Sequence, residues 1–199
     1  MSNHAHSEIL PVGGAGAVST AWWGMACLIA TEAILFVYLI FSYAYLASQQ
    51  DGPWPPSGAP SLKLALPNTV ILVCSSLMLG WGVRQFRGRR DNGRLALFLA
   101  GSIVLGIAFV TIQGFEWAGK PFVFSTNAYS AVFFILTGVH MAHVAVGVLI
   151  LVMLFVWTLM GRFGNAHHEH LALGALYWHF VDVVWIAVFI TAYLVPQFS

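Results

Sequence analysis

The sequence predicts an all-α integral membrane protein with five transmembrane helices. Of its 199 residues, 59% are hydrophobic and only 8% are charged, whereas a soluble domain carries about 25% charged residues. The chain also contains five apolar stretches that reach the ~20 residues needed to cross a bilayer. Because so few charges cannot coat a water-facing surface, most of the exterior must face lipid. The net charge of +1 indicates no polyanionic partner such as a nucleic acid.

The five predicted spans are separated by segments that disfavour helix. The segment Asp51–Pro56 cannot continue a helix, and Pro60 and Pro67 follow closely. Further along, a polar turn at 87–93, the Lys120–Pro121 step and the loop at 161–170 separate the remaining spans. We expect a disordered lead-in over residues 1–19 and a single domain over 20–199. The predicted spans cover about residues 21–47, 66–83, 95–115, 127–160 and 171–195.

The basic residues predict how the chain is oriented. Six arginines lie on one side of the predicted membrane and two lysines on the other, which places the N-terminus in the cytoplasm and the C-terminus outside by the positive-inside rule. These residues are Arg84, Arg87, Arg89, Arg90, Arg94 and Arg162 on one side, and Lys63 and Lys120 on the other. Cys27 and Cys74 lie in apolar runs, and we expect buried small side chains rather than a disulfide.

Glu32 is the most unusual polar residue. It lies about 11 residues into the first span, or roughly 16 Å deep at 1.5 Å per residue, with no basic neighbour in the sequence. Intramembrane carboxyls are costly and usually face a protein interior. Glu32 is therefore either a protonated carboxyl satisfied by one hydrogen bond or a group that handles protons or senses lipid.

Two pairs of polar residues repeat one spacing in the last two spans. His140 and His143 share a face of the fourth span at a depth of roughly 20–24 Å, which makes a contact with Glu32 geometrically possible. Structural hydrogen bonding is favoured over a metal site, which would need a third ligand. In the fifth span, His179 and Asp182 can form a charge-neutral pair that packs helices. Glu116 is expected at the outer interface, where a carboxylate costs little.

Short segments in all five spans resemble the cytochrome c oxidase subunit III family. They occur in the family's order and cover nearly the whole chain from Trp22 onward. The segments are Trp23–Met25 and Thr31–Phe36 in the first span, Pro67–Thr69, Gln113–Trp117, Thr137–Val144 with Gly147, and Tyr177–Trp185 (YWHFVDVVW) in the fifth span.

The resemblance implies a function that the residues alone do not reveal. Subunit III carries no haem or copper, which lie in partner subunits, and it packs against subunit I in a complex that also contains subunit II. It binds phospholipid in a cleft between helix bundles and is thought to support proton uptake and to protect subunit I. Glu32 matches the family's carbodiimide-reactive glutamate. The resemblance also implies a structural or lipid-related role for five further residues, which fall on recurrent positions of the family: Glu116, His140, His143, His179 and Asp182.

The length of the chain departs from the long form of the family, which has seven helices. Five-helix forms occur in bacterial oxidases, so the resemblance implies a bacterial plasma membrane. The nearest alternatives are subunit III of a quinol oxidase and an accessory protein of a nitric oxide reductase. From other classes, a small proton-coupled transporter centred on Glu32 would need discontinuous helices, and an intramembrane metal enzyme would use His140 and His143 as ligands.

Overall fold

The computed structural model describes residues 19–56, 58, 60–161 and 168–198. Its five long helices are α1 (Thr20–Ser48), α2 (Leu62–Arg89), α3 (Asn92–Ala118), α4 (Ala128–Leu159) and α5 (His168–Phe189), which continues as a π-helix (Ile190–Leu194) and a short 3₁₀ turn (Val195–Gln197). Five helical segments of the described chain are long and apolar enough to cross a membrane, which confirms the predicted fold class. The predicted lead-in lies outside the described residues except for Ser19, and Arg162 also lies outside them.

Helices α2 and α3 extend beyond their predicted spans because side-chain caps, rather than the apolar runs, set where they begin, whereas α4 lies within its predicted span. Asp91 accepts hydrogen bonds from the backbone N–H groups of Gly93 and Arg94 at 3.0 and 3.1 Å, which satisfies donors at the start of α3. Arg90 ends α2 in the left-handed conformation, with φ of 50°. The turn between α2 and α3 is therefore only two residues long. Pro67, expected among helix-breaking residues, lies inside α2, as membrane helices tolerate.

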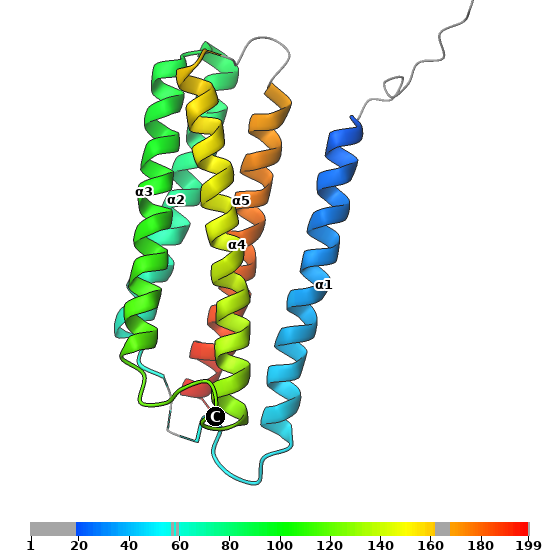
Figure 1. The fold of residues 1–199 in the computed structure, drawn as a ribbon, viewed down its shortest axis with the longest axis vertical. Helices are drawn as coiled ribbons and strands as arrows, with labels where there is room; N and C mark the ends of the chain where they lie inside the picture. Colours follow the sequence, from blue (N-terminus) through cyan, green and yellow to red (C-terminus); the bar gives the residue numbers. More distant parts are fainter. Residues whose placement is uncertain (1–18, 57, 59, 162–167, 199) are drawn as a thin grey trace, which may run out of the picture.

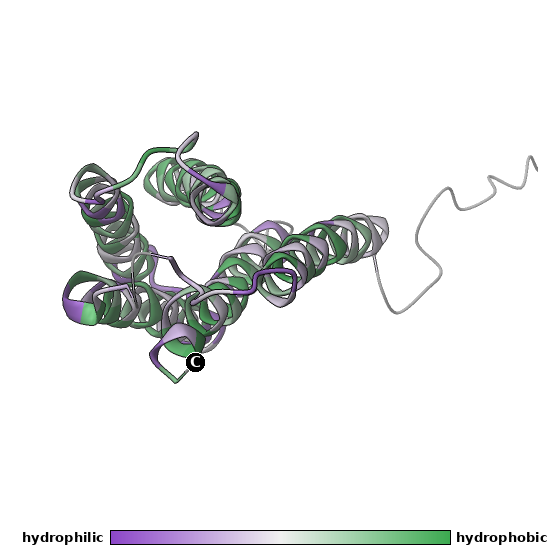
Figure 2. Cartoon of the chain, turned by 90° about the horizontal axis from the view of Figure 1, so that it is seen from below, coloured by the Kyte–Doolittle hydropathy of each residue, from purple (hydrophilic) through white to green (hydrophobic). Residues whose placement is uncertain are grey.

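Helices α2 to α5 form a bundle, and α1 packs against its side (Figure 1). Within the described chain, α1 contacts α4 and α5, and of its own residues only Phe36 and Tyr43 are buried. Seen along the helices, hydrophobic residues dominate all of them (Figure 2). Most of the α1 surface is therefore left for lipid or for another protein.

The two ends of the bundle differ in charge. Arg84, Arg87, Arg90 and Arg94 lie where α2 ends and α3 begins, which we call the arginine end. Lys63 and Lys120 lie where α2 begins and α3 ends, which we call the lysine end; it lies toward the bottom of Figure 1.

Cys27 and Cys74 are free and exposed, so the expectation that both are buried is wrong. A membrane helix can be as apolar on its lipid face as on its core face. An apolar sequence context therefore does not distinguish the two faces.

Candidate functional site: a glutamate–histidine pair between α1 and α4

Glu32 on α1 meets His143 on α4. The Oε2 atom of Glu32 lies 2.9 Å from Nε2 of His143, and both side chains are mostly buried, with 27% and 15% of their surface exposed. The expectation of a contact between Glu32 and a histidine is thus confirmed. The contact is a polar link between α1 and the rest of the bundle.

The second nitrogen of His143 determines how many protons the pair holds. Nδ1 lies 2.7 Å from the backbone carbonyl oxygen of Val139. Because a carbonyl only accepts, Nδ1 must carry a hydrogen. The Nε2···Oε2 contact then holds a single proton. Either a protonated Glu32 donates to a neutral imidazole, or an imidazolium donates to a carboxylate.

His140 lies one turn from His143 but has different surroundings. It is fully buried, and its ring lies 4.9 Å from the ring of Trp185 and 6.0 Å from that of Phe109. Neither ring nitrogen has a hydrogen-bond partner among the described residues. Phe36 of α1 contacts both histidine rings, at 6.1 Å and 5.0 Å between centroids. Only His143 of the two reaches Glu32.

Polar side chains also join α2 to α5. Ser76 Oγ lies 2.6 Å from His179 Nδ1, and the indole of Trp178 donates to Ser75 Oγ at 3.0 Å. Asp182 is buried one turn after His179, and its Oδ1 has no hydrogen-bond partner in the described parts of the chain. The serines were not predicted as site residues because a hydroxyl within an apolar run gives no signal in one sequence.

Thr69 makes a third hydrogen bond between α2 and α5, and the contribution of this bond to stability can be tested by substitution. Its Oγ1 accepts from the indole N–H of Trp185 at 2.9 Å. We expect Thr69→Val to lower the free energy of unfolding by about 1–3 kcal/mol, because it leaves the indole donor unpaired. Thermal unfolding of the detergent-purified chain measures this. Thr111→Val is the control, since the exposed Thr111 hydroxyl bonds, among the described residues, only the Ile107 carbonyl of its own helix. Equal losses would contradict the role of Thr69.

Glu116 lies in a buried network, which corrects the expectation of an interfacial carboxylate that costs little. Only 6% of its side chain is exposed, and Oε1 lies 2.8 Å from Nζ of Lys120. Gln113 Nε2 lies 3.4 Å from Glu116 Oε2 and donates to Tyr193 Oη at 3.2 Å. Asn68 Nδ2 lies 3.4 Å from Gln113 Oε1. The sequence did not predict that α2 and the π-helix after α5 would close around the end of α3.

The described residues contain no group of three or more His, Cys, Asp or Glu side chains placed to hold a metal ion. The sequence also has histidines at positions 167, 168 and 170; α5 begins at His168, and His167 lies outside the described residues. Within the described chain, the polar groups of the membrane spans thus form a shared-proton pair and two sets of hydrogen bonds between helices.

The fold and the site define a polytopic helical membrane protein whose intramembrane polar groups join its helices. The model of the family "Cytochrome c oxidase subunit III" matches residues 15–196. The chain is 35% identical over 179 residues to cytochrome c oxidase subunit 3 of Myxine glutinosa, covering 86% of this chain and 68% of the relative. It is 34% identical over 176 residues to the same subunit of Synechocystis sp., covering 86% and 74%. The chain belongs to the cytochrome c oxidase subunit III family.

Proposed function

We propose that this chain is the non-catalytic subunit III of a haem–copper terminal oxidase that oxidises cytochrome c, reduces O₂ and translocates protons. The observation that carries the proposal is the family match over residues 15–196. In this function the chain holds no redox centre, and haem and copper lie in the partner subunits. It supports proton uptake by subunit I and stabilises that subunit.

The surface of α1 supports a role in a larger complex. Most of its side chains are at least partly exposed, and transmembrane helices with such a surface need lipid or partner helices around them. We propose that subunit I covers part of the bundle, that subunit II and other oxidase subunits complete the complex, and that phospholipid fills the space beside α1. The proposed location is a bacterial inner membrane, with the arginine end in the cytoplasm and the C-terminus outside.

In the proposed function, Glu32 is a protonated carboxyl in the wall of a lipid-filled cleft. A neutral Glu32–His143 pair places no net charge in the membrane, where charge is costly. The 2.9 Å contact with His143 supports this role, since it gives the carboxyl proton an acceptor. Glu32 is therefore a structural and lipid-related group rather than an obligatory proton wire.

An affinity purification of the full chain in mild detergent, followed by an optical spectrum, tests the proposed function. We expect haem a or haem o bands and a large copurifying subunit, and the haem type narrows which oxidase is present. A colourless, monodisperse chain without partners, after gentler detergents, would contradict the proposal and favour a transporter-like protein centred on Glu32.

Substitutions of Glu32 test its role. We expect Glu32→Gln to keep the number of protons pumped per electron, because the amide can still hydrogen-bond His143. Glu32→Leu leaves His143 Nε2 without this partner, which we expect to cost about 1–3 kcal/mol and to release α1 more easily. Pumping is measured with the assembled oxidase in vesicles, and the attachment of α1 by limited proteolysis. Collapsed pumping in Glu32→Gln would show that the carboxyl is an essential proton carrier.

A further inference from the structure

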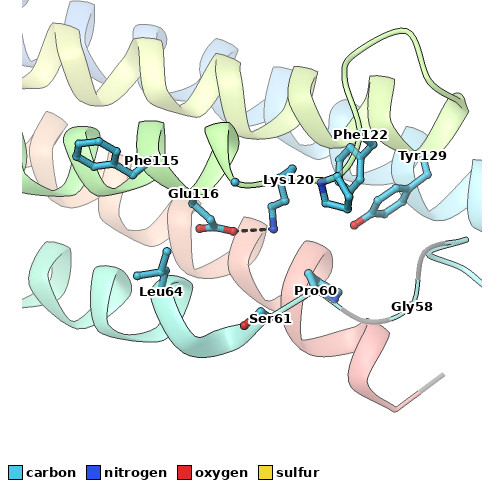
Figure 3. A pocket seen from close by; sticks show the side chains of 11 residues that line it. Gly58, Pro60, Ser61, Leu64, Phe115, Glu116, Lys120, Phe122 and Tyr129 are labelled. Carbon is cyan, nitrogen blue, oxygen red and sulfur yellow. Dashed lines mark ion pairs between the residues drawn. The ribbon is translucent and has the colours of Figure 1, made fainter.

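A pocket of about 260 Å³ opens at the lysine end of the bundle, apart from the Glu32–His143 pair (Figure 3). Helix α2 contributes Leu64, α3 contributes Phe115 and Glu116, and the segment after α3 contributes Lys120. No described residue of α1 lines the pocket. Because pockets for drug-sized ligands measure roughly 300–1,000 Å³, this one suits a smaller polar group.

The wall of the pocket holds fixed charges of both signs. Lys120 and Glu116 form an ion pair of 2.8 Å, and their side chains are only 10% and 6% exposed. An ammonium has three donors, and Glu116 is the acceptor that the structure gives Lys120. An incoming anion would be attracted to Lys120 but would bring a second negative charge close to Glu116, and a cation would face the reverse problem. A ligand that carries both charges avoids both costs.

Polar and aromatic groups beside the ion pair match the two halves of such a ligand. Ser61 lines the pocket, and its hydroxyl, which accepts from the backbone N–H of Lys63 at 3.4 Å, has a hydrogen left to donate to a phosphate. Phe122 and Tyr129 line it on the other side, with ring centroids 5.6 Å apart, and aromatic faces attract ammonium groups. Figure 3 shows the Tyr129 hydroxyl directed toward this space.

The position of the pocket indicates that the ligand comes from the membrane. Leu64 of α2 and Phe115 of α3 line the pocket on its membrane-spanning side, and 49% and 71% of their surfaces are exposed. Lys120 and Ser61 lie just beyond the ends of α3 and α2, where a span meets the headgroup region. A soluble zwitterion would gain nothing from Leu64 and Phe115, whereas acyl chains would pack against them.

We propose that this pocket binds the headgroup of a zwitterionic phospholipid, with its phosphate at Lys120 and Ser61, its ammonium at the Phe122 and Tyr129 side, and its acyl chains along Leu64 and Phe115. The site goes beyond the proposed function and does not depend on it, because any zwitterionic lipid of the host membrane could occupy it.

Lipid retention by the full chain tests this site. The chain is equilibrated with vesicles containing equal amounts of phosphatidylethanolamine and phosphatidylglycerol, repurified in mild detergent, and its bound lipid is counted by native mass spectrometry. We expect Leu64→Trp, which narrows the pocket from a half-exposed position, to lose one retained phosphatidylethanolamine per chain relative to the unsubstituted chain, while phospholipid beside α1 stays bound. Leu66→Trp is the matched control, since Leu66 is 50% exposed on the same helix but does not line the pocket.

Two further measurements identify the ligand chemistry. Lys120→Met should also lose phosphatidylethanolamine; if this variant does not fold, the Leu64→Trp and Leu66→Trp comparison still decides. Soluble glycerophosphoethanolamine at millimolar concentration should not displace the lipid. The proposal is overturned if Leu64→Trp and Leu66→Trp retain phosphatidylethanolamine equally, if phosphatidylglycerol is retained preferentially at this pocket, or if the soluble headgroup competes fully. None of these results depends on whether haem copurifies.

Discussion

Adding a single methyl group at Gly147 is expected to destabilise the bundle by about 1–3 kcal/mol. A Cβ atom at this position on α4 would lie 2.8 Å from Cε3 of Trp178, and a Cβ at Gly106 on α3 would lie 2.8 Å from Cη2 of the same ring. The indole is held in place because its N–H donates to Ser75 and because it is almost completely buried. The ring therefore cannot move away from either methyl group without losing other contacts.

Thermal unfolding of Gly147→Ala and Gly106→Ala in mild detergent measures this effect. For a chain of about 150–250 residues, each kcal/mol corresponds to a change in Tm of about 2–4 °C, so each variant should lose about 2–12 °C. The two losses should not add simply, since both methyl groups press on one ring. Gly114→Ala is the control on α3, because a Cβ there has nothing within 4 Å. A Tm for Gly147→Ala equal to that of Gly114→Ala would show that the bundle is looser around Trp178 than its contacts indicate.

The spans and one contact of the site could be predicted from the sequence because both depend on distance along a helix. An apolar run reports directly on a membrane span, and the rise per residue placed Glu32 and the α4 histidines at similar depths. The rotation of each helix about its axis is not encoded so simply. His140 and His143 are three residues apart, yet His143 meets α1 while His140 packs against Trp185.

The parts of the site that the sequence did not predict depend on partners far along the chain. Ser75, Ser76 and Thr69 gain their roles only because α5 brings two indoles and an imidazole beside α2. These indoles and the imidazole belong to the segment Tyr177–Trp185, which resembles the family. The sequence alone does not give a physical reason for these residue types. The structure supplies that reason, since Trp178, His179 and Trp185 each bond a hydroxyl of α2.

The burial of Glu116 could not be predicted from the sequence for a related reason. Its sequence position correctly places it near the end of α3, but its burial results from tertiary contacts with Lys120, Gln113 and the π-helix that carries Tyr193. A residue at the end of a span is exposed only if no other segment covers it. The loop after α3 turns back over the bundle and brings Lys120 over the rings of Phe133 and Tyr193, at 5.2 and 5.4 Å.

The loss of Lys120 is therefore expected to cost far more stability than the loss of a charge at the other end of α3. Lys120→Met leaves the Glu116 carboxylate buried without its cation, which typically costs about 3–5 kcal/mol. Arg94→Met at the other end of the helix is the control. It breaks the Arg94–Asp91 pair, whose side chains are 54% and 45% exposed, and exposed pairs contribute about 0–1 kcal/mol.

Removing both charges separates the cost of an unpaired charge from the value of the pair. Replacing a buried ion pair by apolar residues of similar size is often neutral or stabilising, so Glu116→Met combined with Lys120→Met should recover most of the Tm lost in Lys120→Met alone. The double variant should still fail to retain phosphatidylethanolamine in this pocket, because both charges of the pocket are gone. If it is as unstable as Lys120→Met, the destabilisation comes from lost packing of the lysine stem over Phe133 and Tyr193 rather than from the unpaired carboxylate. The expected double variant is stable but holds no phosphatidylethanolamine in this pocket. That result would show that the buried ion pair serves lipid binding rather than folding.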